Sequence, residues 1–176
     1  MVQGERAGGL RGAPRSGAHL HAHGEALGGS RAWCARQVEY GKVSRSGYSE
    51  DIDDNWALIR YRGMVASAIR GRRGQAFMRD LVDALDSLPE KRLIAGALED
   101  HGAVCAIGSV GIKRGVDMSN LDPEDAEAVA AKFDIAEPLA REIVYMNDEG
   151  YHVTSECRWR DMRAWAVGNL KHQRQP

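Results

Sequence analysis

Residues 56–88 read as two amphipathic helices joined by a short connection that is rich in glycine and arginine. In each helix, apolar residues recur three or four positions apart, which places them on one face. These residues are Leu58, Tyr61, Val65 and Ile69 in the first helix, and Phe77, Leu81, Val82 and Leu85 in the second. The pattern predicts that residues 71–74 end the first helix, that Gln75 opens the second, and that Pro89 stops it. Gly63, inside the first helix, is expected at a close helix crossing.

Two further helices are expected between residues 122 and 147. Asp122 is a candidate N-cap, and Pro123 would occupy the first helical position, where its missing N–H has no cost. The next helix is predicted to begin at 135–138. A last helix begins near Thr154, and its apolar stripe consists of Trp159, Met162, Ala166 and Leu170, with Trp165 adjacent.

Residues 93–112 have a different character, because small and apolar residues dominate. Asp100-His101-Gly102 is a turn signal between LIAGAL and AVCAIGSV, so two short strands are predicted, although LIAGAL also fits a helical turn. The predicted fold is therefore mainly α: a compact bundle of about five helices with a small β-hairpin or extended segment. A single globular domain is expected over residues 48–172, since 176 residues suffice for one hydrophobic core.

Residues 1–47 are predicted to be a disordered tail. Nine of the 20 glycines lie within residues 1–42, and the apolar residues there follow no helical or strand period. Val43 is the residue that an internal GTG codon would encode, so we expect the natural start near Val43. The histidines of HLHAH (His19, His21 and His23) lack supporting groups in this tail, and no metal site is predicted from them.

Charge and cysteine content limit the partners and the cellular compartment that can be expected for this protein. The chain has a net charge of −1, and residues 43–176 carry 18 Lys/Arg against 22 Asp/Glu, so no global attraction to nucleic acid or membrane is expected. No apolar run approaches the roughly 20 residues of a membrane helix. Cys34, Cys105 and Cys157 are odd in number and widely spaced, which argues against a disulfide framework or zinc site and is consistent with a reducing cytoplasm.

No catalytic, metal or cofactor motif stands out. GRRGQ lacks the spacing of a P-loop, the glycines after Cys105 lack that of a dinucleotide fingerprint, and the acidic run 50–54 lacks that of an EF-hand. Cys105 is expected in the core and His101 in a polar turn. An enzyme would require these groups to converge in a pocket, and no catalytic residue is predicted.

Arginines supply the candidate binding residues. Three groups are candidates for binding nucleic acid: the basic connection and its flanks, an isolated arginine near residue 140, and the last helix. They comprise Arg70, Arg72, Arg73 and Arg79; Arg141; and Arg158, Arg160 and Arg163. The alternative is that these side chains form solvated helix surfaces and pair with nearby carboxylates.

The helical pair at 126–146 has the order of a helix-turn-helix, with Ala130, Ile135 and Ile143 at packing positions. Three features depart from that motif. Asp134 stands where a turn glycine is usual, and Pro138 lies early in the second helix, which would be the recognition helix. Acidic residues around Arg141 would repel phosphates. Simple helical packing is the competing interpretation.

From Ser44 onward the chain resembles an uncharacterised family of small bacteriophage and prophage proteins. The resemblance rests on SRSGYSED, NWALIRYRG, SAIRGRRGQAF, ALDSLPEKRLIAGALED, VCAIGSVG, RGVDMSNLDPED, EIVYMNDE and RWRDMRAW. It implies a phage-derived cytoplasmic protein and brings no activity. The sequence therefore favours a non-enzymatic accessory or interaction protein with an unknown protein or nucleic-acid partner. The alternative is a small nucleic-acid-binding protein that uses the arginine-rich helix ends or the 126–146 pair.

Overall fold

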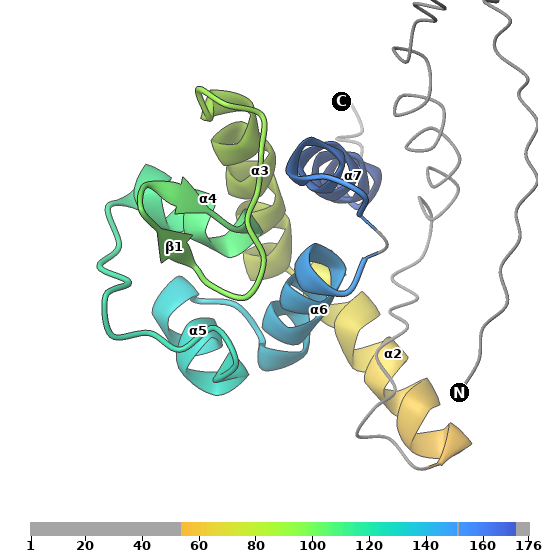
Figure 1. Ribbon diagram of the computed structural model, residues 1–176. Coiled ribbons are helices and arrows are strands. Elements are labelled where there is room, and N and C mark those ends of the chain that lie inside the picture. The colour runs from red at the N-terminus through yellow and green to blue at the C-terminus, as the bar shows by residue number, and fades with distance from the viewer. Residues whose placement is uncertain (1–53, 151, 172–176) are drawn as a thin grey trace, which may run out of the picture.

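The computed structural model describes residues 54–150 and 152–171, which fold into six helices and one antiparallel hairpin (Figure 1). The elements are α2 (Asn55–Arg70), α3 (Arg72–Ser87), β1 (Glu99–Asp100), β2 (Ala103–Val104), α4 (Ala106–Arg114), α5 (Ala126–Phe133), α6 (Glu137–Asp148) and α7 (Ser155–Gly168). The predicted fold class, mainly α with a small hairpin, is confirmed. The predictions of a disordered tail, a start near Val43 and a histidine cluster fall outside the described residues.

The corner between α2 and α3 is tighter than predicted. Asp54 caps α2 by accepting a hydrogen bond from the Ala57 N–H at 2.7 Å, and α3 begins at Arg72, so Gly71 alone separates the two helices. The prediction that residues 71–74 form the joint is wrong, because arginine is a good helix former and continues directly into the second helix. At Gly74 an added Cβ would lie 2.0 Å from the Ala68 carbonyl oxygen, so this glycine permits the close approach.

The hairpin is shorter than predicted, and the segment after it is a helix. β1 and β2 pair Glu99 with Val104, and His101 and Gly102 form the turn with positive φ. Residues 106–111 are all buried in α4, whereas the sequence analysis placed them in a strand. A segment that is apolar on every side fits either structure. The helix ends at Gly115, which has a φ of 65°.

α5 also begins later than predicted. Its N-cap is Asp125, which accepts a hydrogen bond from the Ala128 N–H at 3.0 Å, so Asp122 and Pro123 precede the helix. Asp134 ends α5 in the left-handed conformation, with a φ of 54°, where a glycine is usual. α6 follows after two residues, with Pro138 in its first turn.

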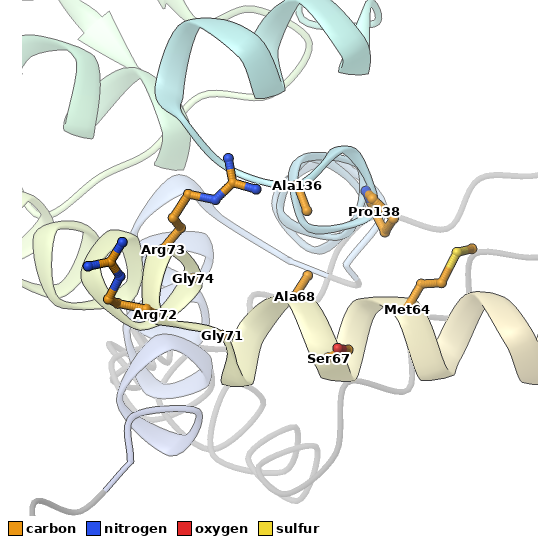
Figure 2. Close-up of a pocket in the computed structure, with 9 residues that line it drawn as sticks. All are labelled: Met64, Ser67, Ala68, Gly71, Arg72, Arg73, Gly74, Ala136 and Pro138. Carbon is orange, nitrogen blue, oxygen red and sulfur yellow. The ribbon is translucent and has the colours of Figure 1, made fainter.

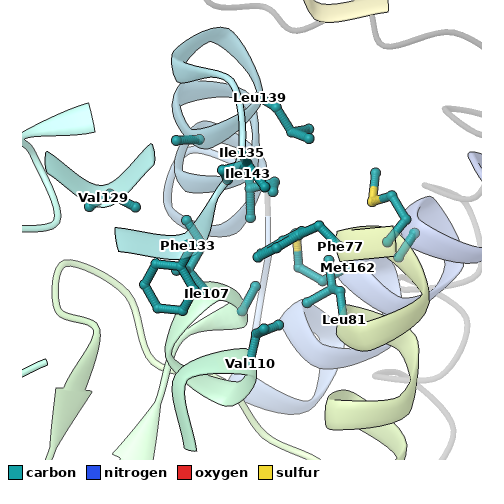
Figure 3. Close-up of a cluster of buried hydrophobic side chains, with 14 of the residues drawn as sticks. Phe77, Leu81, Ile107, Val110, Val129, Phe133, Ile135, Leu139, Ile143 and Met162 are labelled. Atoms are coloured by element: carbon teal, nitrogen blue, oxygen red, sulfur yellow. The ribbon is translucent and has the colours of Figure 1, made fainter. Parts of the chain in front are cut away.

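The core lies between α3, α4, α5, α6 and α7 (Figure 3). Phe77 of α3 and Phe133 of α5 meet edge to face, with ring centroids 6.3 Å apart. The predicted apolar positions of α7, Met162, Trp165 and Ala166, are buried. α2 packs against α3 and α6, and its N-terminal half extends beyond the other described helices (Figure 1). Of the described helices, none has the length and apolar character needed to cross a membrane.

Gly63 does not lie at a helix crossing. An added Cβ at this position would meet nothing within 4 Å. The prediction of a close helix crossing at Gly63 is therefore wrong, because the opposite face of α2, with Tyr61, Val65 and Ile69, is the one that packs. Gly63 lies in an open, exposed part of α2 instead.

Candidate nucleic-acid interface

The described chain divides sharply by charge. Residues 55–79, here called the basic segment, contain six arginines and no Asp or Glu. Residues 80–171 contain ten Lys/Arg and eighteen Asp/Glu. The basic segment comprises α2 and the first half of α3, so a local positive surface is attached to an otherwise acidic body. A net charge near zero therefore conceals a surface that can attract a polyanion.

Four arginines of the basic segment are exposed, and their side chains form no hydrogen bond or ion pair with another described residue: Arg60, Arg62, Arg72 and Arg79. Arg73 pairs with Asp134 at 3.0 Å, and both side chains are more than half exposed. A pair exposed to this degree contributes little to stability and can exchange partners. Arg70 uses its Nε to donate to the Ala66 carbonyl at 2.9 Å.

A groove of about 580 Å³ lies where the α2–α3 corner faces the start of α6 (Figure 2). Its two ends differ in chemistry. Met64, Ala68 and Pro138 line one part, whereas Arg72 and Arg73 line the other. The groove therefore presents an apolar wall beside two guanidinium groups.

The electrostatics at the start of α3 are unusual. Its N-cap, Gly71, offers no side-chain hydrogen bond, and the first turn contains no acidic residue. Helix starts normally attract negative side chains, because the unpaired N–H groups and the helix dipole are positive there. Here Arg72 and Arg73 occupy that turn instead, so the positive charge accumulates beside the groove. An anion from outside the described chain would neutralise this positive charge.

The other predicted arginines lie elsewhere and have partners within the fold. Arg163 makes two hydrogen bonds to Asp86, at 2.5 and 2.9 Å. Arg158 donates to the carbonyls of Asn147 and Leu93, Arg160 lies 3.5 Å from Asp161, and Arg141 pairs with Glu137 at 2.8 Å. The structure thus groups Arg70, Arg72, Arg73 and Arg79 in the basic segment and separates the remaining four from it.

The 126–146 pair keeps the order of a helix-turn-helix but not its exposure. α6, which would be the recognition helix, packs against α2, α4, α5 and α7. Leu139, Ala140, Glu142 and Ile143 are all fully buried. A helix covered in this way cannot enter a major groove, so simple packing is the interpretation that the geometry favours.

Arg60 and Arg62 were missed by the sequence analysis, which did not include them among the candidate binding residues. The signal that reveals them is the absence of any acidic residue between Asp54 and Asp80. Hydrophobic periodicity identifies the buried face of a helix. A charged binding surface is found instead by counting the charged residues on the exposed face.

The groups considered for catalysis do not converge. Cys105 is buried, and this burial raises its pKa to about 11, although the Gly108 N–H hydrogen bond acts in the opposite direction. The thiol is therefore protonated at neutral pH and is a poor nucleophile. His101 is almost fully exposed in the hairpin turn. Within residues 54–150 and 152–171, no group of His, Cys, Asp and Glu is arranged to hold a metal ion.

Comparisons with protein families, with curated proteins and with solved structures find no match to this chain. The resemblance to phage and prophage proteins stays a prediction. Function must accordingly be argued from the basic segment and the groove.

Proposed function

We propose that the protein is a non-enzymatic nucleic-acid-binding protein whose contact surface is the basic segment. The observation that carries the proposal is the run of six arginines without an acidic residue between Asp54 and Asp80. Phosphate contacts by Arg and Lys supply most of the affinity of non-specific nucleic-acid binding. Unpaired, exposed arginines are suited to this role, because no internal ion pair has to be broken first.

The position of these arginines supports the same proposal. Arg60, Arg62 and Arg70 lie on α2, whose N-terminal half extends beyond the other described helices (Figure 1). Arg72 and Arg73 line the groove at the start of α3 (Figure 2), and Arg79 lies further along α3. Apart from Asp54, which caps α2, the acidic residues of the described chain lie after residue 79. A polyanion can therefore approach α2 without passing close to most of the carboxylates, whose repulsion would otherwise offset the attraction.

This function agrees with the expectation of an interaction protein and specifies nucleic acid as the partner. The phage or prophage origin implied by the sequence resemblance is compatible with such a role. The buried α6 and the paired arginines of α7 disfavour the other two candidate binding elements.

The test is a salt titration of binding to labelled nucleic acid, with matched double variants. Arg72→Gln with Arg79→Gln removes two unpaired charges from the basic segment. Arg92→Gln with Lys132→Gln removes two exposed charges from the acidic body, where Arg92 pairs with Glu90 and Glu156. The first variant should bind more weakly and lower the slope of log K against log salt by about two, because each phosphate contact contributes about one.

The second variant should bind like the parent protein. Thermal unfolding of both variants establishes that they are folded. Absence of saturable binding at low salt contradicts the proposal. So does a loss confined to the Arg92 and Lys132 variant, because binding would then depend on the acidic body.

A further inference from the structure

The face of α2 that points away from the core combines an aromatic ring with positive charge. Trp56, Arg60, Gly63, Ser67 and Arg70 recur three or four positions apart and therefore share one side of the helix. All five are exposed. Trp56 is 74% exposed, which is unusual for so large an apolar side chain.

Two further apolar side chains border this face. Ile59 and Met64 are each more than half exposed, and an added Cβ at Gly63 would meet nothing within 4 Å. Trp56 and Met64 are eight residues apart, about 12 Å along the helix axis. Met64 belongs at the same time to the wall of the groove.

We infer that the nucleic acid bound by this surface is single-stranded, with unstacked bases lying against Trp56 and in the apolar part of the groove. The inference rests on the proposed function and adds that the bound nucleic acid is single-stranded and not double-stranded. In a duplex the faces of the bases are stacked on one another, and only their edges are accessible in the grooves. Exposed aromatic and aliphatic side chains among arginines match a strand whose base faces are free.

The groove fits one nucleotide in chemical terms. Arg72 and Arg73 suit a phosphate, whereas Met64, Ala68 and Pro138 offer an apolar wall for a base (Figure 2). Its volume of about 580 Å³ lies within the usual range for small-ligand sites. From the groove, a strand that follows α2 toward its N-terminus would pass Arg60 and reach the ring of Trp56, one turn before Arg60 and next to the α2 N-cap, Asp54.

The test measures binding of an oligothymidylate of about twelve nucleotides and of a duplex of equal length, at the same salt, to the full chain. The variants are Trp56→Ala, Trp56→Phe and Met64→Ala. The exposure of both positions leaves the fold intact, which circular dichroism would verify. The parent protein should prefer the single strand by about tenfold or more, and Trp56→Ala should lower single-strand affinity by about tenfold.

The pattern of effects separates stacking from charge. Trp56→Phe should retain most of the affinity, because an aromatic ring remains. The salt slope should stay unchanged in Trp56→Ala, since no phosphate contact is removed. Met64→Ala should weaken binding of the single strand more than that of the duplex.

Two outcomes overturn the inference, and they are distinguishable. Equal, salt-sensitive affinity for both probes, together with no effect of Trp56→Ala, would reject the single-strand assignment while leaving the proposed function in place. Failure to bind either probe at low salt would reject both.

Discussion

The side-chain amide of Gln75 donates a hydrogen bond of 2.9 Å to the backbone carbonyl of Asn169, 94 positions further along the chain. The same amide donates to the Ile69 carbonyl at 2.9 Å, and its oxygen accepts from the Lys171 N–H at 2.8 Å. Gln75 thus connects the end of α2, the start of α3 and the end of α7. Its side chain is only 5% exposed, so water cannot readily replace these bonds.

Replacing Gln75 by methionine should lower the free energy of unfolding by about 2–4 kcal/mol, because three hydrogen bonds are lost and two backbone carbonyls lose a buried donor. Urea denaturation measures the change. Asn120→Met, at an exposed amide whose one side-chain bond is long, is the matched control and should have little effect. A loss below about 0.5 kcal/mol at Gln75 would mean that the connection is dispensable.

Two glycines should respond to alanine in opposite directions. Gly74→Ala places a methyl group 2.0 Å from the Ala68 carbonyl oxygen, so it should destabilise the protein by about 1–3 kcal/mol or more. Gly63→Ala enters open space inside an exposed helix and should stabilise by about 0.5–1 kcal/mol. Thermal unfolding compares the two. Stabilisation by Gly74→Ala would disprove the close packing of the α2–α3 corner.

One exposed and one buried tryptophan should likewise differ in how much their replacement by alanine changes stability. Trp165 is 5% exposed and Trp56 is 74% exposed. Trp165→Ala should cost about 3–5 kcal/mol, whereas Trp56→Ala should change stability by no more than about 0.5 kcal/mol. Denaturant unfolding followed by circular dichroism gives both values. A loss below about 1 kcal/mol for Trp165 would place its ring at the surface instead of in the core.

Asp80 should make the free energy of unfolding depend on pH in the acidic range. Burial acts to raise its pKa, but hydrogen bonds from Arg114 and Lys113, together with their charges, outweigh it and hold the pKa below the usual range. A carboxyl with a depressed folded pKa stabilises the protein fully above its unfolded pKa of about 3.9 and loses that contribution as the pH falls through the folded pKa.

Asp80→Asn should therefore destabilise at neutral pH, and its difference from the parent protein should shrink below about pH 4. Urea unfolding across this range measures the difference. In an Arg114→Met background the effect of Asp80→Asn should be smaller, because the principal donor is gone. A difference that is constant with pH would argue against the ion pair.

The sequence predicted the helical elements better than their ends. Periodicity located α2, α3 and α7, because their buried faces repeat at 3.6 residues. It failed in α4, where residues 106–111 are buried on all sides, since a helix with no polar face has no period to detect. It also failed at Gly74, where the constraint is a contact with Ala68 that depends on how two helices pack.

The candidate site was predictable in part. The connection around Arg72 and Arg73 was identified from composition, and Arg70 and Arg79 lie in the same basic segment. The roles of Arg158 and Arg163 were not predictable, because their partners Asn147 and Asp86 are brought near by the fold. The groove likewise depends on Pro138 reaching α2 through the packing of α6.

The separation of charge along the described chain also affects how the molecule meets a partner. The basic segment carries six arginines and no carboxylate, whereas residues 80–171 carry ten Lys/Arg against eighteen Asp/Glu, so the protein has a charge dipole despite a net charge of −1. A polyanion exerts a torque on such a dipole and turns the protein before contact, with α2 leading. Productive orientations are then more frequent than random collision would give, and this advantage fades once the Debye length falls below the distance between the two charged regions.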